Sequence, residues 1–95
     1  MAPEMKRVEG RDAGDVVLYA LSTCGWCKKT KRLLGELGVG YRYIDVDQLD
    51  RADRRAVEEQ VMSWNPRGSF PTIVIGNKNC IVGFKEDQIR EALGS

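Results

Sequence analysis

Val16-Val17-Leu18-Tyr19-Ala20-Leu21-Ser22-Thr23-Cys24-Gly25-Trp26-Cys27 is the stretch that decides the fold of this chain. Its first part, 16–21, is apolar without interruption and rich in branched and aromatic side chains. Such a run is typical of a strand that is covered on both faces, as in a parallel sheet. Ser22 and Thr23 then allow a short turn, and a lysine-rich helical segment begins near Cys24. Two cysteines therefore lie where a buried strand leads into a helix.

The position of these cysteines predicts a redox centre. At a helix start, unpaired backbone N–H groups and the positive end of the helix dipole favour thiolate over thiol at Cys24. Cys27 follows one turn later on the same side, within the Cα separation of about 4.4–6.8 Å that a disulfide tolerates. We expect Cys27 to point inward and Cys24 outward, and the pair to cycle between dithiol and disulfide.

A pair of cysteines at this spacing is also half of a zinc site. Structural zinc requires four nitrogen or sulfur ligands. The chain has no histidine, and Cys80 is the third of its three cysteines. The sequence therefore predicts redox chemistry and no metal site. We expect Cys80 to pack as a small hydrophobic residue in a short strand, with a resolving or regulatory role as the alternative.

Size and composition predict one soluble domain. The chain has 95 residues, of which 42% are hydrophobic and 31% are charged, and its net charge of +1 argues against nucleic-acid binding. No apolar run approaches the roughly 20 residues that span a bilayer, and the polar start lacks the hydrophobic stretch of a signal peptide. We therefore expect a cytoplasmic protein that does not bind membranes, in a compartment that keeps thiols reduced.

Residues 1–14 are charged and contain scattered glycines, so they are predicted to be a flexible leader before a domain over 15–95. Hydrophobic periodicity and turn residues divide that domain into an α/β order β-α-β-α-β-β-α, with a four-stranded mixed sheet flanked by helices. The predicted strands are 16–21, 41–46, 72–75 and 80–82, and the predicted helices are 24–37, 52–63 and 86–93.

Three motifs give the chain a family resemblance. They are Cys24-Gly25-Trp26-Cys27 after the first strand, Phe70-Pro71-Thr72 before the third strand, and Gly83-Phe84 after the fourth. With these motifs, residues 15–93 resemble the glutaredoxin-like branch of the thioredoxin superfamily. The resemblance implies a thioredoxin fold, a cis peptide bond before Pro71, and catalysis by Cys24 and Cys27. It also implies a substrate groove along the second and third motifs, where extended backbone pairs with the substrate.

The resemblance further implies a thiol–disulfide oxidoreductase that acts on protein or small disulfides and needs no cofactor besides its redox-active disulfide. Members that use glutathione usually carry a lysine where this chain has Leu21, and a Gly-Gly pair where it has Val82-Gly83-Phe84. The stretch from Gly83 is closer to small redoxins that reduce ribonucleotide reductase. The predicted electron donor is a thioredoxin reductase-type protein or glutathione. We expect a monomer; a [2Fe–2S] cluster carrier, with glutathione as an extra ligand, is the alternative.

Side chains beside the motif allow two interpretations. Trp26 either contacts partners as an exposed aromatic or fills a groove, and we favour the first. A basic run follows on the helix, made of Lys28, Lys29, Lys31 and Arg32. It is either a solvated face or a group that supports the thiolate and steers acidic partners, with Lys28 and Lys29 nearest to the motif.

Overall fold

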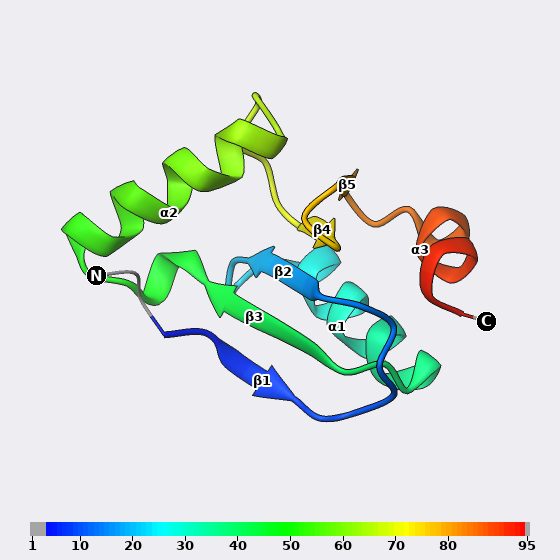
Figure 1. Ribbon diagram of the computed structural model, residues 1–95. Helices are drawn as coiled ribbons and strands as arrows, with labels where there is room; N and C mark the ends of the chain where they lie inside the picture. Colours follow the sequence, from blue (N-terminus) through cyan, green and yellow to red (C-terminus); the bar gives the residue numbers. More distant parts are fainter. Residues whose placement is uncertain (1–3, 95) are drawn as a thin grey trace.

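The computed structural model describes residues 4–94 (Figure 1). From β2 onward the order of strands and helices confirms the predicted β-α-β-α-β-β-α, and a 3₁₀ turn over Val46–Gln48 follows β3. The elements are β1 (Lys6–Val8), β2 (Val16–Ala20), α1 (Gly25–Leu37), β3 (Tyr41–Asp45), α2 (Arg51–Trp64), β4 (Thr72–Ile75), β5 (Asn79–Val82) and α3 (Glu86–Leu93).

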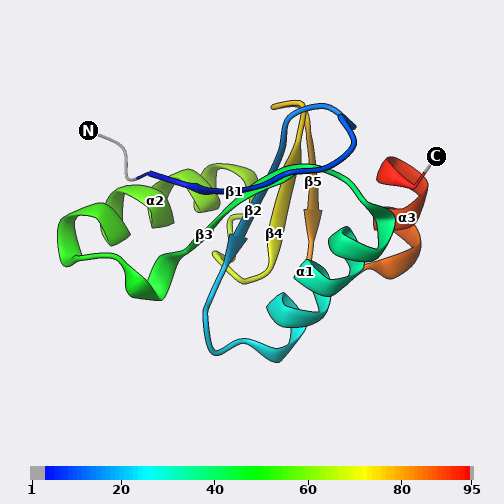
Figure 2. The ribbon, with the colours of Figure 1, turned by 90° about the horizontal axis from the view of Figure 1, so that it is seen from below.

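A five-stranded mixed sheet in the order β1-β3-β2-β4-β5 forms the centre of the molecule. β2 and β3 are parallel, with Leu18 opposite Tyr43, whereas β4 is antiparallel to both β2 and β5. Figures 1 and 2 show that α2 covers one face of this sheet and that α1 and α3 cover the other. The parallel first pair and the closing hairpin are both as predicted.

β2 is buried on both faces, which explains its uninterrupted apolar sequence. Val16, Leu18 and Ala20 belong to one core cluster with residues of α1 and α3. Val17 and Tyr19 alternate with them and belong to a second cluster with residues of α2. Burying one such aliphatic side chain contributes about 1.5–3 kcal/mol. The central strand is therefore held from both sides, and the loop that follows it starts from a rigid base.

The predicted four-stranded sheet and loose leader need correction, because β1 adds a fifth strand within 1–14. β1 pairs antiparallel with β3, and Lys6 lies opposite Tyr43. Further along, the N–H of Arg11 donates to the carbonyl of Gly38 at 2.7 Å. A three-residue charged edge strand has too little alternation to be recognised from its sequence. Residues 1–3 and 95 of the predicted leader and domain lie outside the described part.

Next to the cysteines, β2 ends one residue earlier than predicted and α1 begins one residue later. β2 stops at Ala20, because the carbonyl of Leu21 turns to accept the N–H of Cys24 at 3.2 Å. α1 begins at Gly25 with Cys24 as its N-cap residue. The helix ends at Leu37, and its C-cap residue Gly38 has a φ of 69°, a left-handed conformation that glycine adopts without strain. The predicted strand and helix are thus right to within one residue at this junction.

Candidate functional site

One end of the sheet collects all three sequence motifs. The carboxyl ends of β2 and β3 meet there, because the two strands are parallel and Ala20 lies opposite Asp45. β4 starts at the same end, with Thr72 opposite both Tyr19 and Val82. The loops that carry Cys24, Pro71 and the residues after β5 therefore converge by topology alone.

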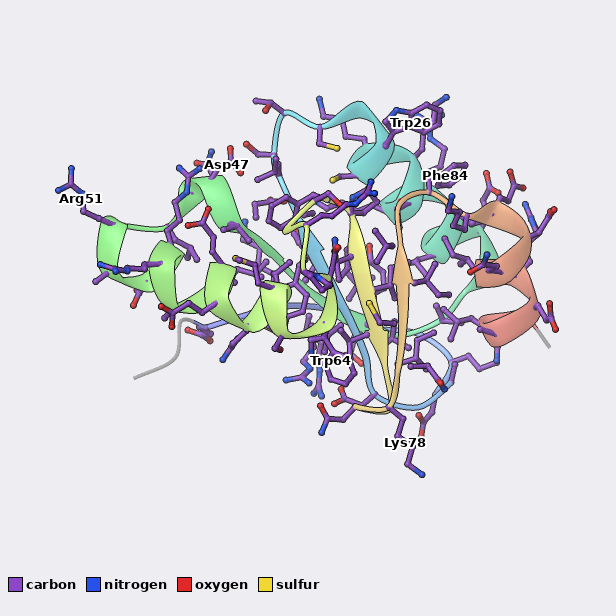
Figure 3. The ribbon with its side chains drawn as sticks, turned by 90° about the horizontal axis from the view of Figure 1, so that it is seen from above. Trp26, Asp47, Arg51, Trp64, Lys78 and Phe84 are labelled. Carbon is purple, nitrogen blue, oxygen red and sulfur yellow. The ribbon has the colours of Figure 1, made fainter. Side chains whose placement is uncertain are left out.

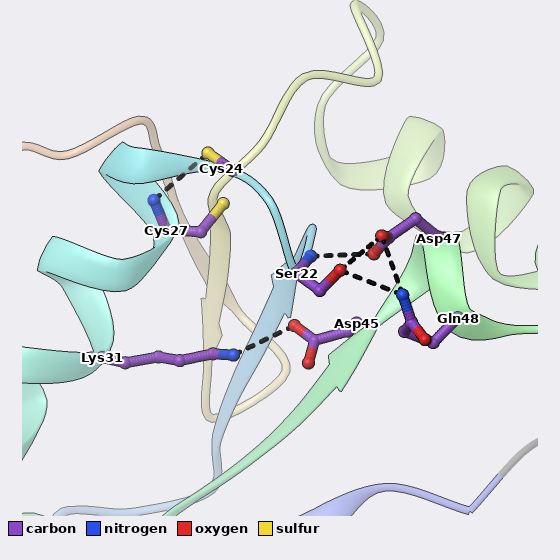
Figure 4. A network of polar contacts seen from close by, with 7 residues as sticks. All are labelled: Ser22, Cys24, Cys27, Lys31, Asp45, Asp47 and Gln48. Carbon is purple, nitrogen blue, oxygen red and sulfur yellow. Dashed lines mark hydrogen bonds and ion pairs between the residues drawn. The ribbon is translucent and has the colours of Figure 1, made fainter.

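Cys24 and Cys27 occupy the start of α1. The Sγ of Cys24 accepts the backbone N–H of Cys27 at 3.2 Å, so the sulfur acts as the N-cap of the helix (Figure 4). Cys24 is half-buried, whereas Cys27 is fully buried in the core. Both are free thiols in this structure. The predicted inward and outward orientation is confirmed, and the exposed sulfur is the one that receives a backbone hydrogen bond.

The environment of Cys27 keeps its thiol protonated. The pKa of Cys27 is raised to about 12, first by burial and second by its hydrogen bond with Cys24. The charge of Cys24 acts in the same direction, while the charge of Lys31 opposes it. At neutral pH Cys27 is thus a thiol that is held next to its partner sulfur.

A carboxylate anchors the turn between β2 and Cys24. Asp47 accepts the backbone N–H of Ser22 at 2.8 Å and also the hydroxyl of Ser22 (Figure 4). The amide of Gln48 donates to the Ser22 oxygen at 3.0 Å and to Asp47 at 3.2 Å. The hydrogen bond from the Ser22 hydroxyl, followed by that from its N–H, lowers the pKa of Asp47 to about 2. Because Asp47 stays ionised, the anchor persists over the whole physiological pH range.

Lys31 differs from the solvated lysine that the basic run suggests. Its Nζ is 3.0 Å from Asp45 at the end of β3 and 4.3 Å from the ring centroid of Tyr43. The side chain is 26% exposed, so the helix turns it toward the sheet instead of toward solvent. Lys31 therefore ties α1 to β3 beneath the cysteines (Figure 4).

The second motif forms a rigid wall of the site. The peptide bond between Phe70 and Pro71 is cis, as predicted. The half-buried Phe70 packs against both core clusters. Gly83, with a φ of 83°, donates its N–H to the carbonyl of Pro71 at 2.8 Å. This bond joins the second and third motifs, with Pro71 buried and Gly83 half-buried.

A buried polar network holds the loop before β4. Asn65 is 4% exposed, and its amide donates to the carbonyl of Ser69 at 3.1 Å and to the hydroxyl of Thr72 at 3.2 Å. Thr72 in turn donates its hydroxyl to the Ser69 carbonyl at 2.8 Å. Thr72 is fully buried, so its side chain holds the loop from inside.

Trp26 and Phe84 make an aromatic ledge next to the cysteines. Their ring centroids are 5.9 Å apart and the rings are stacked, as Figure 3 shows. The Nζ of Lys29 lies over the Trp26 ring at 4.6 Å from its centroid. Trp26 is 58% exposed, which agrees with its interpretation as a partner contact instead of a groove filler. Lys28 is exposed at the same helix start.

The remaining candidates lie outside this centre. Cys80 is half-buried on the edge strand β5 opposite Val74, and burial raises the pKa of its thiol. Trp64 is half-buried at the end of α2 and packs against the second core cluster. Within residues 4–94, no three His, Cys, Asp or Glu side chains are grouped as a metal ion would need. None of the described helices is long and apolar enough to cross a membrane.

Sequence reasoning missed the residues that support the motifs. Ser22 and Asp47 are 25 residues apart, and Lys31 and Asp45 are 14 apart, so no local pattern links them. One signal was available: a polar residue two positions after the end of each of two parallel strands lies at the shared end of the sheet, as Ser22 and Asp47 do. Asn65 gave no signal beyond its position at a helix end.

Comparison with known proteins gives the family. The glutaredoxin family model matches residues 16–81. The methanoredoxin crystal structure of Methanosarcina acetivorans is 52% identical and superimposes with a TM-score of 0.87, with 90% of each chain covered. The glutaredoxin crystal structure of Methanosarcina mazei is 48% identical at a TM-score of 0.89, with 98% of this chain and 90% of that one covered.

Curated relatives agree. A glutaredoxin-like 8.6 kDa protein of the rubredoxin operon of Clostridium pasteurianum is 34% identical over 74 residues, which are 78% of this chain and 91% of that protein. The match to the glutaredoxin of Ricinus communis is 27% identical and covers 67% of this chain, but it spans only 61% of that longer protein. The fold is therefore the thioredoxin fold with one added edge strand, and the chain belongs to the glutaredoxin family.

Proposed function

We propose that this protein is a thiol–disulfide oxidoreductase that works through a Cys24/Cys27 dithiol–disulfide cycle. The single observation that carries the proposal is the asymmetry of the pair. Cys24 is half-buried at a helix N-terminus and accepts a backbone N–H at 3.2 Å, whereas Cys27 is fully buried. This asymmetry supports a role for Cys24 as the sulfur that meets the substrate and for Cys27 as the sulfur that meets only Cys24.

In the first step the Cys24 thiolate attacks one sulfur of a substrate disulfide. The substrate S–S bond breaks, a mixed disulfide forms, and the departing thiolate takes up a proton. In the second step Cys27 gives up its proton and attacks the Sγ of Cys24. The mixed disulfide breaks, the second substrate thiol leaves, and the Cys24–Cys27 disulfide remains. The protein has then lost two electrons and the substrate has gained two.

The raised pKa of Cys27 supports this order of events. Burial, the hydrogen bond with Cys24 and the charge of Cys24 all raise the pKa of Cys27. When Cys24 becomes part of a mixed disulfide, its charge is gone, and this contribution disappears. Cys27 is then easier to ionise at the moment when its attack is needed. The nearby Lys31 charge favours the same ionisation.

Turnover tests the assignment. Reduction of a small disulfide protein, with dithiothreitol as the terminal reductant, is measured for the wild type and for Cys24→Ser and Cys27→Ser. We expect Cys24→Ser to lose the activity and Cys27→Ser to turn over more slowly, because its mixed disulfide can be resolved only by dithiothreitol. Cys80→Ala is the matched control, since it removes a cysteine that is remote from the helix start, and it should keep wild-type rates. A Cys24→Ser protein with near wild-type turnover would make the assignment wrong.

For the electron donor, we propose a thioredoxin reductase-type protein ahead of glutathione. The proposal rests on Leu21 at the turn before Cys24 and on Phe84, which stacks on Trp26 beside the motif. Fluorescence of Trp26 in a Trp64→Phe background follows reduction of the disulfide form by millimolar glutathione or by a reductase system with NADPH. We expect fast reduction only by the reductase. Fast reduction by glutathione would show that glutathione is the electron donor instead.

A further inference from the structure

An open groove of about 290 Å³ runs between α1 and the turn that starts α3. We call it the α1–α3 groove. Its apolar part is formed by Leu33, which is 4% exposed, and by the half-buried Phe84. Its polar lining residues are Lys29, Arg32, Glu36 and Glu86.

The groove is continuous with the aromatic ledge. Phe84 lines the groove and also stacks on Trp26, with ring centroids 5.9 Å apart. Lys29 lines the groove and also lies over the Trp26 ring at 4.6 Å. Trp26 is the residue before Cys27, and Figure 3 shows Trp26 and Phe84 side by side at one end of the molecule. A chain segment lying in the groove would therefore reach the start of α1, where Cys24 is the N-cap residue.

The charge of the groove is uneven along its length. Glu36 and Glu86 lie 3.7 Å and 2.8 Å from the guanidinium of Arg90, so they share one cation and their charges are partly compensated within the fold. By contrast, some cations of the helix start and of the turn before α3 have no carboxylate within ion-pair distance in the described part of the chain. These are Lys28, Lys29, Arg32 and Lys85. The end of the groove nearest to the cysteines is thus positive and uncompensated.

The combined length of the groove and the aromatic ledge favours a peptide over a small thiol. From Trp26 on the ledge to Glu36 in the groove, the helix rises by about 15 Å. An extended chain covers at most about 3.3–3.6 Å per residue, so a segment of four to five residues is needed to follow both. This is longer than a tripeptide, and it suits a segment of a protein that carries the disulfide.

We propose that the α1–α3 groove is the docking surface for protein disulfides whose flanking segment carries acidic side chains next to an apolar one. This inference deepens the proposed function and rests on it. The carboxylates of the segment pair with Lys29 and Arg32, and the apolar side chain packs against Phe84 and Trp26. Charge pairs of this exposed kind act mainly on the rate of encounter, so selectivity is expected in the rate of disulfide attack.

The test uses two synthetic peptides with the same internal disulfide and the same apolar residue, one with two glutamates and the other with two lysines beside the cysteines. A fluorophore and quencher pair on each peptide reports cleavage by the reduced protein. At low ionic strength we expect the acidic peptide to react roughly tenfold faster. The advantage should shrink in 0.5 M salt, because screening shortens the reach of exposed charges. Equal rates for both peptides would overturn the docking surface.

Charge-reversal variants test whether the preference for the acidic peptide depends on Lys29 and Arg32 in the groove. The double variant Lys29→Glu/Arg32→Glu should remove or invert the preference, and Lys29→Gln/Arg32→Gln should reduce it with less disturbance of the helix. The matched control is Arg51→Glu/Arg55→Glu on α2, which makes the same change in net charge at exposed positions. Arg51 lies far from Trp26 in Figure 3, so this control should keep the wild-type ratio. A control that lost the preference equally would show that net charge, and not the groove, selects the substrate.

The peptide experiment distinguishes failure of the proposed oxidoreductase function from failure of the docking surface. If the wild type cleaves neither peptide, the proposed oxidoreductase function is wrong, and the docking surface falls with it. If it cleaves both at the same rate, the function stands and only the docking surface is wrong. Preference for the acidic peptide that is lost in the groove variants and kept in the α2 control supports both.

Discussion

At the scale of single residues, the reactive sulfur depends on a neighbour in space that is remote in sequence. Asp47 follows β3, yet it holds Ser22, two residues before Cys24, through the backbone N–H at 2.8 Å and the hydroxyl. The turn from Leu21 to Cys24 then presents the Cys24 sulfur to the N–H of Cys27 at 3.2 Å. We regard Asp47 as a positioning residue, since it acts on the sulfur only through this turn.

Asp47→Ala should lower the rate at which iodoacetamide alkylates Cys24 by several-fold at neutral pH, because the freed turn no longer holds the sulfur at the helix start. The rate is measured by mass spectrometry in a Cys80→Ala background. Asp47→Asn keeps one acceptor oxygen and should recover part of the rate. Asp12→Ala removes another exposed carboxylate, which accepts the Gly14 N–H at 2.9 Å before β2, and should change nothing. An unchanged rate in Asp47→Ala would contradict the positioning role.

At the scale of elements, α1 and α2 each begin at a residue whose side chain caps the helix. α1 is capped by a cysteine sulfur, whereas α2 is capped in the ordinary way by Asp50, whose carboxylate accepts the N–H of Asp53 at 2.9 Å. A carboxylate cap contributes about 1 kcal/mol, and a thiol is a weak acceptor. Of these two helices, α1 therefore has the weaker cap, which is the proposed nucleophile Cys24 itself, and α2 on the other face of the sheet has the stronger one.

Asp50→Ala should reduce the free energy of unfolding by about 1 kcal/mol and leave disulfide reduction unchanged. In a domain of this size that loss lowers Tm by roughly 4–8 °C. Thermal unfolding measures the first effect, and turnover of a disulfide protein measures the second. Asp50→Ser keeps a capping oxygen and should retain most of the stability. A loss of turnover in the folded Asp50→Ala protein would mean that α2 contributes to the site directly.

The elements that the sequence predicts best are those with a strong hydrophobic pattern, either an uninterrupted apolar run or a helical period. β2 was predictable because all of its residues are buried, and α1 because polar and apolar residues alternate with helical spacing. β1 was missed because Lys6 and Arg7 are exposed and only Val8 is partly buried, so its pairing with β3 depends on backbone bonds. Asn65, Asp47 and the Lys31–Asp45 pair were missed for a related reason, as their partners are defined only by the folded chain.

At the scale of the whole molecule, stability is linked to the ionisation of groups that the fold buries. Burial raises the pKa of Cys27 to about 12, and it also raises the pKa of Tyr19 and Tyr41. The unfolded chain ionises a cysteine near pH 8.5 and a tyrosine near pH 10. Above these values the unfolded state binds fewer protons than the native state, so stability falls as the pH rises.

The reduced protein should therefore lose stability between about pH 8.5 and pH 12, and the loss should begin at lower pH than the tyrosines alone would cause. Urea midpoints at pH 7.5 and pH 10 measure this for the reduced wild type and for Cys27→Ala. The variant is expected to be less stable at pH 7.5, because it leaves a small cavity, but to lose less on going to pH 10. Identical losses in both proteins would show that Cys27 ionises in the native state as readily as in the unfolded chain.

The central claim, that Cys24 attacks first and Cys27 second, is tested most directly by trapping the intermediate. Reduced Cys27→Ser/Cys80→Ala protein is mixed with a protein disulfide, and the product is mapped by peptide mass spectrometry without reduction. We expect one covalent adduct, joined through Cys24 and stable because the variant lacks the Cys27 thiol that would resolve it. Cys24→Ser/Cys80→Ala, which keeps only the buried Cys27, should form none. An adduct on Cys27 in that variant, or no adduct on Cys24 in the first, would contradict the account.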